Sequence, residues 1–176
     1  MDQAAPADTA RKHDGTWMIA VGAIVASVGA YGFQVVGGRS LGADGFAPVA
    51  TVWTIGFLVY TIVMLPVEQM TTRTVTLRAG SALEPDTRRQ IAVALTSGGL
   101  IGVVIAAVGT DRFFDGSAVF ILAMALLMLS RALMTIARGV MAGRRRFRAY
   151  GFTMMLEAVA LVTLGVIFAV ADASAF

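Results

Sequence analysis

Hydrophobic residues in this chain come in long blocks rather than at helical or strand period. Each block is about twenty residues long, and short polar segments separate the blocks. At a rise of 1.5 Å per residue, such a block matches the roughly 30 Å hydrocarbon core of a bilayer. A soluble helical protein would instead show one apolar stripe per helix. The pattern predicts an all-α integral membrane bundle of about five transmembrane helices, at residues 16–37, 46–65, 91–109, 118–136 and 150–171.

The polar segments suggest how these spans begin and end. Residues 1–15 are interpreted as a disordered cytoplasmic tail, and residues 16–176 as a single transmembrane helical domain. The first block is too long for the apolar core of a signal peptide, and further spans follow it, so we expect a retained helix. Pro66 marks a kink or a break after the second block, and Pro85 lies where the third helix would begin.

Composition supports the membrane interpretation and narrows the chemistry. The chain is 57% hydrophobic and 14% charged, whereas a soluble domain is roughly a quarter charged. It contains no cysteine, which excludes disulfides and thiolate metal sites, and no asparagine, which excludes an N-glycosylation sequon. His13 stands without partner ligands, and no G-x-S-x-G, Walker or paired-carboxylate pattern occurs. We therefore expect no enzyme activity, catalytic residue, cofactor or metal site.

The distribution of basic residues predicts the orientation in the membrane. One set of alternate loops, together with the N-terminal tail, holds most of the bases: Arg11, Lys12, Arg73, Arg78, Arg88, Arg89, Arg138, Arg144, Arg145, Arg146 and Arg148. The opposite loops hold only Arg39 and Arg112. The positive-inside rule then places the N-terminus in the cytoplasm and, after an odd number of spans, the C-terminus outside. We expect a multi-pass protein of the cytoplasmic membrane, in contact with membrane lipids and not with nucleic acid.

Small residues recur four positions apart on two of the predicted helices. Gly22, Ala26 and Ala30 line one face of the first, and Gly98 and Gly102 do so on the third. Such faces let helix backbones approach closely in lipid. Such a face can pack against another helix of the same chain, form a dimer contact or line a substrate groove, and the sequence leaves these three uses open.

A second set of candidates is charged. The cluster Arg144, Arg145, Arg146 and Arg148 either fixes topology alone or also binds anionic lipid headgroups.

Arg131 and Glu157 lie inside apolar blocks, at matching depths on the consecutive fourth and fifth helices. Residues of opposite charge within spans commonly pair with each other, so these two are candidates for an intramembrane ion pair. The alternative is that Arg131 snorkels to the headgroups and Glu157 is protonated.

Three stretches resemble a known family. The segment 38–46, Gly-Arg-Ser-Leu-Gly-Ala-Asp-Gly-Phe, is similar to the R-x-L-G-x-x-x-[FY] turn after the first helix of polysaccharide transporters. The segment 138–150 is similar to the R-G-x-x-x-G-x-x-R-F motif before their fifth helix, and Leu65-Pro66 with Thr72-Arg73 fits the end of their second. Over residues 16–171 the chain resembles the polysaccharide biosynthesis and O-antigen flippase-like family, within the multidrug/oligosaccharidyl-lipid/polysaccharide exporter superfamily.

That resemblance implies flipping of a lipid-linked polysaccharide precursor by alternating access, with an arginine-lined cavity for the lipid pyrophosphate. Arg39 and Arg73 are the candidates for such a cavity, and their alternatives are a polar loop position and an interfacial one. Members of the family have about twelve to fourteen helices in two lobes, and alternating access needs both bodies to move around a central site. The chain is therefore expected to be part of one lobe, working with a missing C-terminal lobe or a second polytopic chain.

Two other functions stay open. A cation-coupled drug exporter of the same superfamily would need acidic residues within its spans, and only Glu157 qualifies in the predicted blocks. A non-transporting membrane partner or scaffold would be consistent with the short chain and its small-residue faces.

Overall fold

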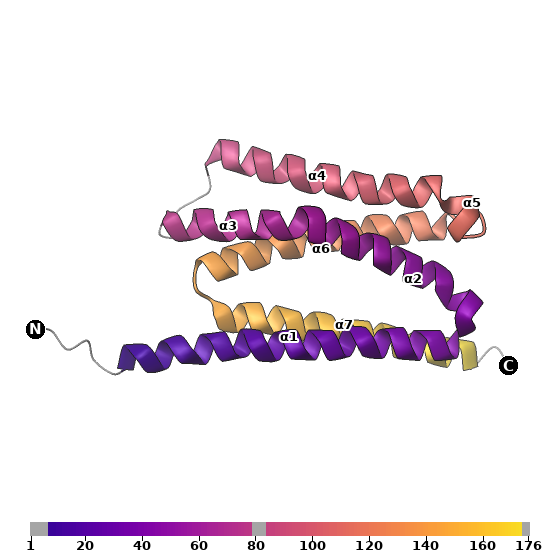
Figure 1. The fold of residues 1–176 in the computed structure, drawn as a ribbon, viewed down its shortest axis with the longest axis horizontal. Coiled ribbons are helices and arrows are strands. Elements are labelled where there is room, and N and C mark those ends of the chain that lie inside the picture. The colour runs from indigo at the N-terminus through magenta and orange to yellow at the C-terminus, as the bar shows by residue number, and fades with distance from the viewer. Residues whose placement is uncertain (1–6, 79–83, 174–176) are drawn as a thin grey trace, which may run out of the picture. The chain divides into compact units, whose positions relative to one another are not determined.

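The computed structural model describes residues 7–78 and 84–173, with side chains described for 17–78, 84–167 and 170. Every regular element in these ranges is a helix (Figure 1). In chain order they are α1 (Ala7–Ser40), α2 (Gly42–Val59), η1 (Tyr60–Met64), α3 (Leu65–Leu77), α4 (Pro85–Val108), α5 (Thr110–Phe113), α6 (Val119–Gly143) and α7 (Phe147–Ala173).

Five helical stretches among the described residues are long and apolar enough to cross a membrane: Trp17–Ser40, Gly42–Leu77, Pro85–Val108, Val119–Gly143 and Phe147–Ile167. This confirms the all-helical architecture and the number of candidate spans. Helix α1 begins at Ala7, within the segment 1–15 interpreted as a disordered tail. Residues 1–6 of that segment lie outside the described residues.

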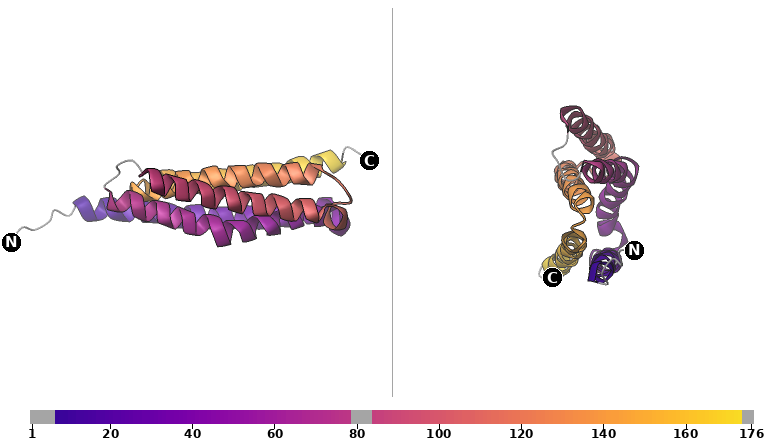
Figure 2. Two further views of the ribbon diagram at one scale, coloured as in Figure 1. Left: turned by 90° about the horizontal axis from the view of Figure 1, so that it is seen from above. Right: turned by 90° about the vertical axis from the view of Figure 1, so that its left-hand side faces the viewer.

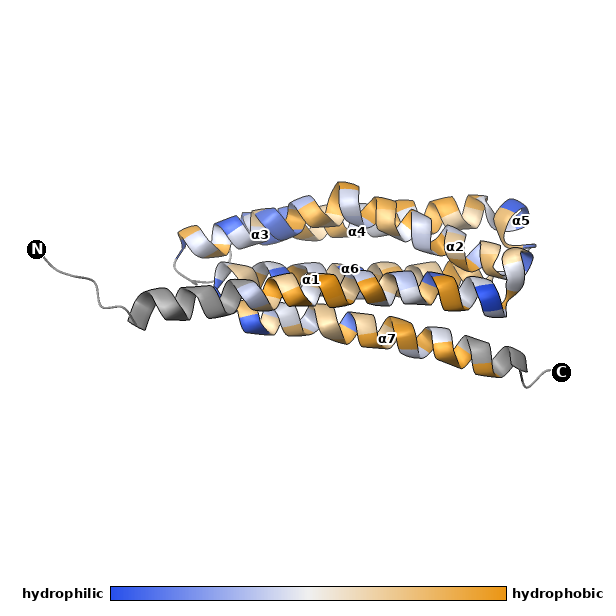
Figure 3. Ribbon diagram, turned by 60° about the horizontal axis from the view of Figure 1, so that its bottom comes forward, coloured by the Kyte–Doolittle hydropathy of each residue, from blue (hydrophilic) through white to orange (hydrophobic). Residues whose placement is uncertain are grey.

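The surfaces of these helices are apolar along their length. Val28, Ile62, Leu100, Leu126 and Val159 are each more than half exposed. Figure 3 shows hydrophobic residues along the middle of the helices and hydrophilic residues toward their ends. Soluble monomers rarely expose apolar area on this scale. The five helices therefore suggest a multi-pass membrane protein whose exposed faces contact lipid.

The second span passes through Pro66, where the sequence suggests a kink or a break. The helix does not break, because α2, η1 and α3 follow one another without a gap, and Figure 1 shows a bend between α2 and α3. In η1 the turn widens to a π-helix, and the Leu65 N–H donates to the Tyr60 carbonyl, five residues back. A proline ring clashes with the carbonyl four residues before it in a regular α-helix, and a wider turn relieves that clash. This span therefore extends to Leu77 and includes Glu68.

The described helices form two compact units, of which α1 and α7 make up unit 1. A Cβ added at Gly22 would lie 2.8 Å from the Gly151 carbonyl oxygen, and one added at Gly29 would lie 2.8 Å from the Ala158 Cβ. The residue numbers of the contacting positions rise together along both helices, so α1 and α7 run parallel, side by side (Figures 1 and 2). The close contacts recur every seven residues, as in left-handed helix pairs. Gly29, one heptad after Gly22, therefore continues the close contact that begins at Gly22.

Unit 2 contains α2 to α6 and has an apolar core. Its buried side chains come from α2, η1, α3, α4 and α6 and from the turn after α5: Val59, Met64, Val67, Ile91, Leu95, Ala106, Phe114, Met124 and Met128. Helix α4 packs through its two small residues, because a Cβ at Gly98 would lie 2.8 Å from Val63 and one at Gly102 would lie 3.0 Å from the Met128 sulfur. Of the uses open for Gly98 and Gly102, the structure shows internal packing.

A polar seam between α3 and α6 is the candidate functional site

A close helix contact in unit 2 joins α3 and α6. A Cβ added at Gly139 would lie 2.7 Å from the Thr71 Cβ and 3.0 Å from the Glu68 carbonyl oxygen. One added at Gly143 would lie 2.6 Å from the Val75 Cβ. Only glycine permits this approach, so the two glycines, four residues apart, form a small-residue packing face on α6. The right-hand view of Figure 2 looks along these helices.

Two threonine hydroxyls of α3 fix the register against α6. The Thr72 hydroxyl lies 2.9 Å from the Glu68 carbonyl oxygen and 3.2 Å from that of Gly139. The Thr76 hydroxyl repeats this pattern, 2.8 Å from the Thr72 carbonyl and 3.4 Å from that of Gly143. Both bridges join residues 67 positions apart in sequence. Helices α3 and α6 therefore run parallel with a constant offset.

We use the name polar seam for five residues of this contact: Glu68, Thr71 and Thr72 on α3, with Thr135 and Arg138 on α6. Glu68 and Arg138 are each 5% exposed, Thr135 is 1% exposed and Thr71 is 0% exposed. The Thr71 hydroxyl donates to the Val67 carbonyl at 2.8 Å. Among the residues that the structure describes, the buried Thr135 hydroxyl has no hydrogen-bond partner.

Burying polar and charged groups is costly, and ionisable residues within membrane spans are functional candidates by default. The two helices of the seam belong to stretches that are long and apolar enough to cross a membrane, Gly42–Leu77 and Val119–Gly143. The seam is therefore the strongest candidate site in the described chain.

Arg131 lies on the same face of α6 as Thr135 and Arg138, the two residues that this helix contributes to the polar seam. It lies four residues before Thr135, is half-buried, and holds its guanidinium 5.4 Å from the centroid of the Tyr60 ring. An arginine over an aromatic face at this distance gains cation–π attraction. Glu157, its predicted partner, is half-buried on α7 in unit 1. Because the two residues belong to different units, their pairing stays a prediction.

The other sequence candidates lie at helix ends on exposed positions. Arg39 is in the last turn of α1 and Arg73 is on α3, and the structure leaves both side chains exposed. The basic cluster occupies the turn after α6 and the start of α7, and all four of its side chains are exposed: Arg144, Arg145, Arg146 and Arg148. Of these candidates, Arg73 and Arg144 belong to unit 2 with the polar seam, and their side chains are exposed rather than buried in it.

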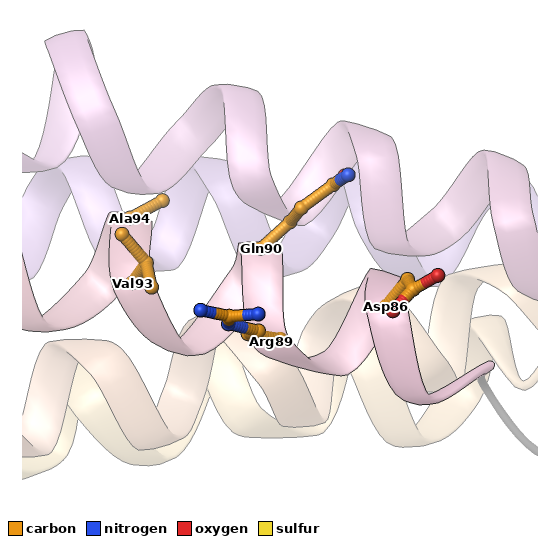
Figure 4. Close-up of a pocket in the computed structure, with 5 residues that line it drawn as sticks. All are labelled: Asp86, Arg89, Gln90, Val93 and Ala94. Carbon is orange, nitrogen blue, oxygen red and sulfur yellow. The ribbon is translucent and has the colours of Figure 1, made fainter.

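A shallow depression of about 480 Å³ lies on the first turns of α4 (Figure 4). The described residues that line it, Asp86, Arg89, Gln90, Val93 and Ala94, all come from this one helix. Polar groups from separate elements do not converge on it, which distinguishes it from a typical ligand site. Among the described residues, no cluster of three or more His, Asp or Glu side chains is arranged to hold a metal ion.

Sequence reasoning did not identify Glu68, Thr135 or Arg138 as site residues. Glu68 follows Pro66, where the second span was expected to end, and Arg138 was assigned to a cytoplasmic loop that is in fact the last part of α6. The sequence signal that could have identified them is the spacing of Gly139 and Gly143, the two glycines of the R-G-x-x-x-G-x-x-R-F motif. Read as a helix-packing pair, this spacing indicates that α6 continues past residue 136 and approaches another helix closely.

Basic residues gather at one end of unit 2. This is the end where α3 and α6 finish and α4 begins, and it holds Arg73, Arg78, Arg88, Arg89 and Arg144. Arg112, on α5, lies at the other end. Arg78 and Glu84 form an exposed ion pair between the end of α3 and the start of α4, and such surface pairs contribute little to stability.

Comparisons with family models, curated proteins and solved structures found no match to this chain.

Proposed function

We propose that this chain is part of a membrane transporter that flips a lipid-linked polysaccharide precursor across the cytoplasmic membrane by alternating access. The observation that carries the proposal is the polar seam, which buries Arg138 within an apolar span. Arg131 lies two helical turns before it, on the same helix. Guanidinium groups bind the oxygens of phosphate groups with favourable geometry. A lipid pyrophosphate is a substrate that would need such cations at membrane depth.

The distribution of bases supports an orientation for this transporter. In unit 2 they gather where α3 ends and α4 begins. In unit 1 the parallel helices α1 and α7 both begin beside basic residues, Arg11 and Lys12 for α1 and Arg146 and Arg148 for α7. With the positive-inside rule, each unit separately favours a cytoplasmic N-terminus and an external C-terminus. Arg138 then lies five residues before the cytoplasmic end of α6, on the side of the membrane where such precursors carry their sugars before transport.

Alternating access also requires a second body. Five spans do not supply two rocking lobes around a central site. We propose that a further helical lobe or a second polytopic chain completes the transporter, and that the exposed apolar faces of the spans provide its contact surface.

The test combines loss of the gene with one substitution. In the organism that encodes the chain, deletion should leave lipid-linked glycan precursors accumulated on the cytoplasmic face and reduce surface polysaccharide. Arg138→Gln should reproduce the defect while the protein remains in the membrane, and Arg112→Gln, on the exposed α5, is the matched control. Unchanged surface polysaccharide with no precursor accumulation in the deletion strain would refute the proposal.

One observation favours the cation-coupled drug exporter as a second candidate. That function needs acidic groups within spans, and Glu68 adds a buried carboxyl on the second span to Glu157 on the fifth. Export of a cationic dye that depends on Glu68, with normal glycan precursors in the deletion strain, would identify this alternative.

A further inference from the structure

The contact between α3 and α6 repeats in layers one helical turn apart. Thr76 meets Gly143 in the last layer, and Thr72 meets Gly139 in the layer before it. In both layers, a hydroxyl of α3 lies close to a backbone carbonyl of α6. One turn earlier on both helices, the same positions hold Glu68 and Thr135. The register therefore places a carboxyl where the next two layers have a hydroxyl.

The environment of this first layer is closed. Glu68 is 5% exposed and Thr135 is 1% exposed. Glu68 lies nine residues before the end of α3, and Thr135 lies eight before the end of α6. At 1.5 Å per residue, both are roughly 12–14 Å from the base-rich end of unit 2. The Thr135 hydroxyl has no hydrogen-bond partner among the described residues, and such a group is a rare and costly feature of a protein interior.

We propose that Glu68 is a proton-binding group of the protein interior, and that the Thr135 hydroxyl is its partner on the facing helix. In the protonated state, the carboxylic acid donates its O–H to an α6 carbonyl, as the hydroxyls of Thr72 and Thr76 do in their layers. When the proton leaves, the carboxylate keeps the bonding electrons and accepts a hydrogen bond from the Thr135 hydroxyl. The Thr135 hydroxyl, which has no hydrogen-bond partner among the described residues, is then the donor to Glu68 in the deprotonated state.

The charges around Glu68 decide how easily the proton leaves. From α6, Arg138 belongs to the same seam and favours the carboxylate, while Arg131 lies over Tyr60 one turn earlier. From α4, the buried positions Ile91, Leu95 and Gly98 carry no titratable group, and the charged Asp86, Arg88 and Arg89 are exposed in its first turns. On its own helix, Arg73 is exposed. Arg138 is thus the buried charged group that shares the seam with Glu68 among the described residues.

This proposal does not depend on the transported substrate, and it is tested on the purified protein in lipid. Infrared spectra are recorded between pH 4 and pH 9, and the carbonyl stretch of a protonated carboxylic acid is assigned by its loss in Glu68→Gln. The expected result is a Glu68 band that disappears as the pH rises. In Thr135→Val the band should persist about one to two pH units higher, because the carboxylate has lost a hydrogen bond.

Two controls separate this result from general damage. Glu157→Gln changes a half-buried carboxyl on α7 and should leave the Glu68 band in place. Ser130→Val removes an exposed hydroxyl of α6, which donates to the Leu127 carbonyl, and should not move the titration. A spectrum in which Glu68→Gln removes no protonated carboxyl band at any pH would overturn the proposal. A Glu68 band whose pH dependence is the same in Thr135→Val would overturn the role of Thr135.

Discussion

At the scale of single residues, the polar seam depends on the absence of a side chain at Gly139. Backbone and side-chain atoms of Thr71 and Glu68 occupy the space that a Cβ would need. Close approach of the two backbones in turn brings the Thr72 hydroxyl within 3.2 Å of an α6 carbonyl. Small residues and interhelical hydrogen bonds of this kind drive helix association where lipid supplies no hydrophobic force.

We predict that Gly139→Ala destabilises the protein by about 1–3 kcal/mol, since overpacking a tight contact forces the helices apart. Thermal unfolding of the purified protein in detergent should show a lower midpoint. Gly32→Ala is the matched control, because a Cβ there meets nothing within 4 Å, and alanine is the better helix former. An equal loss in both variants would contradict the packing role of Gly139.

A second residue-scale prediction concerns Arg131 and Glu157. If they pair, removal of one leaves an uncompensated charge in an apolar setting, and removal of both is milder. Folded yield in detergent should therefore fall steeply in Arg131→Leu and in Glu157→Leu, and less than additively in the double variant. Tyr60→Leu, which removes the ring under Arg131, gives the size of the cation–π contact alone. Simple additivity of the two single losses would argue against the pair.

At the scale of elements, the widened turn in the second span matters most. A π-helical turn corresponds to one residue inserted into an α-helix. Here it lies directly before Pro66 and gives the proline ring the room that a regular helix lacks. Because the helix continues, Glu68 and Thr72 reach α6 instead of lying in a loop.

We predict that deletion of Ile62, an exposed residue in η1, is tolerated only when Pro66 is also changed to alanine. The deletion should convert the π turn to a regular α turn, and the proline ring would then clash with the preceding turn. Folded yield by size-exclusion chromatography should fall in the deletion alone and recover in the double variant. Deletion of Leu126 in α6, where no π turn can absorb it, should not be rescued by Pro66→Ala.

At the scale of the whole molecule, the five spans and the distribution of bases make one prediction about topology. An alkaline phosphatase fused after Phe176 should be active, because the positive-inside rule places that end outside. The same enzyme inserted between residues 79 and 83 should be inactive, since the base-rich end of unit 2 is expected in the cytoplasm. A fluorescent protein at each site should give the complementary pattern. A cytoplasmic signal after Phe176 would contradict either the number of spans or their orientation.

The sequence by itself determined that the chain is helical and has five candidate spans, because block hydrophobicity is a local property of the chain. Two spans extend further than predicted: the second reaches Leu77, because a π turn accommodates Pro66, and the fourth continues to Gly143. Only the tertiary structure decided which residues meet. The contact of Gly29 with Ala158, and the alignment of Glu68 with Thr135, depend on how two helices cross and on their register. Helix spacing places side chains on a face, but the partner of that face is set by packing.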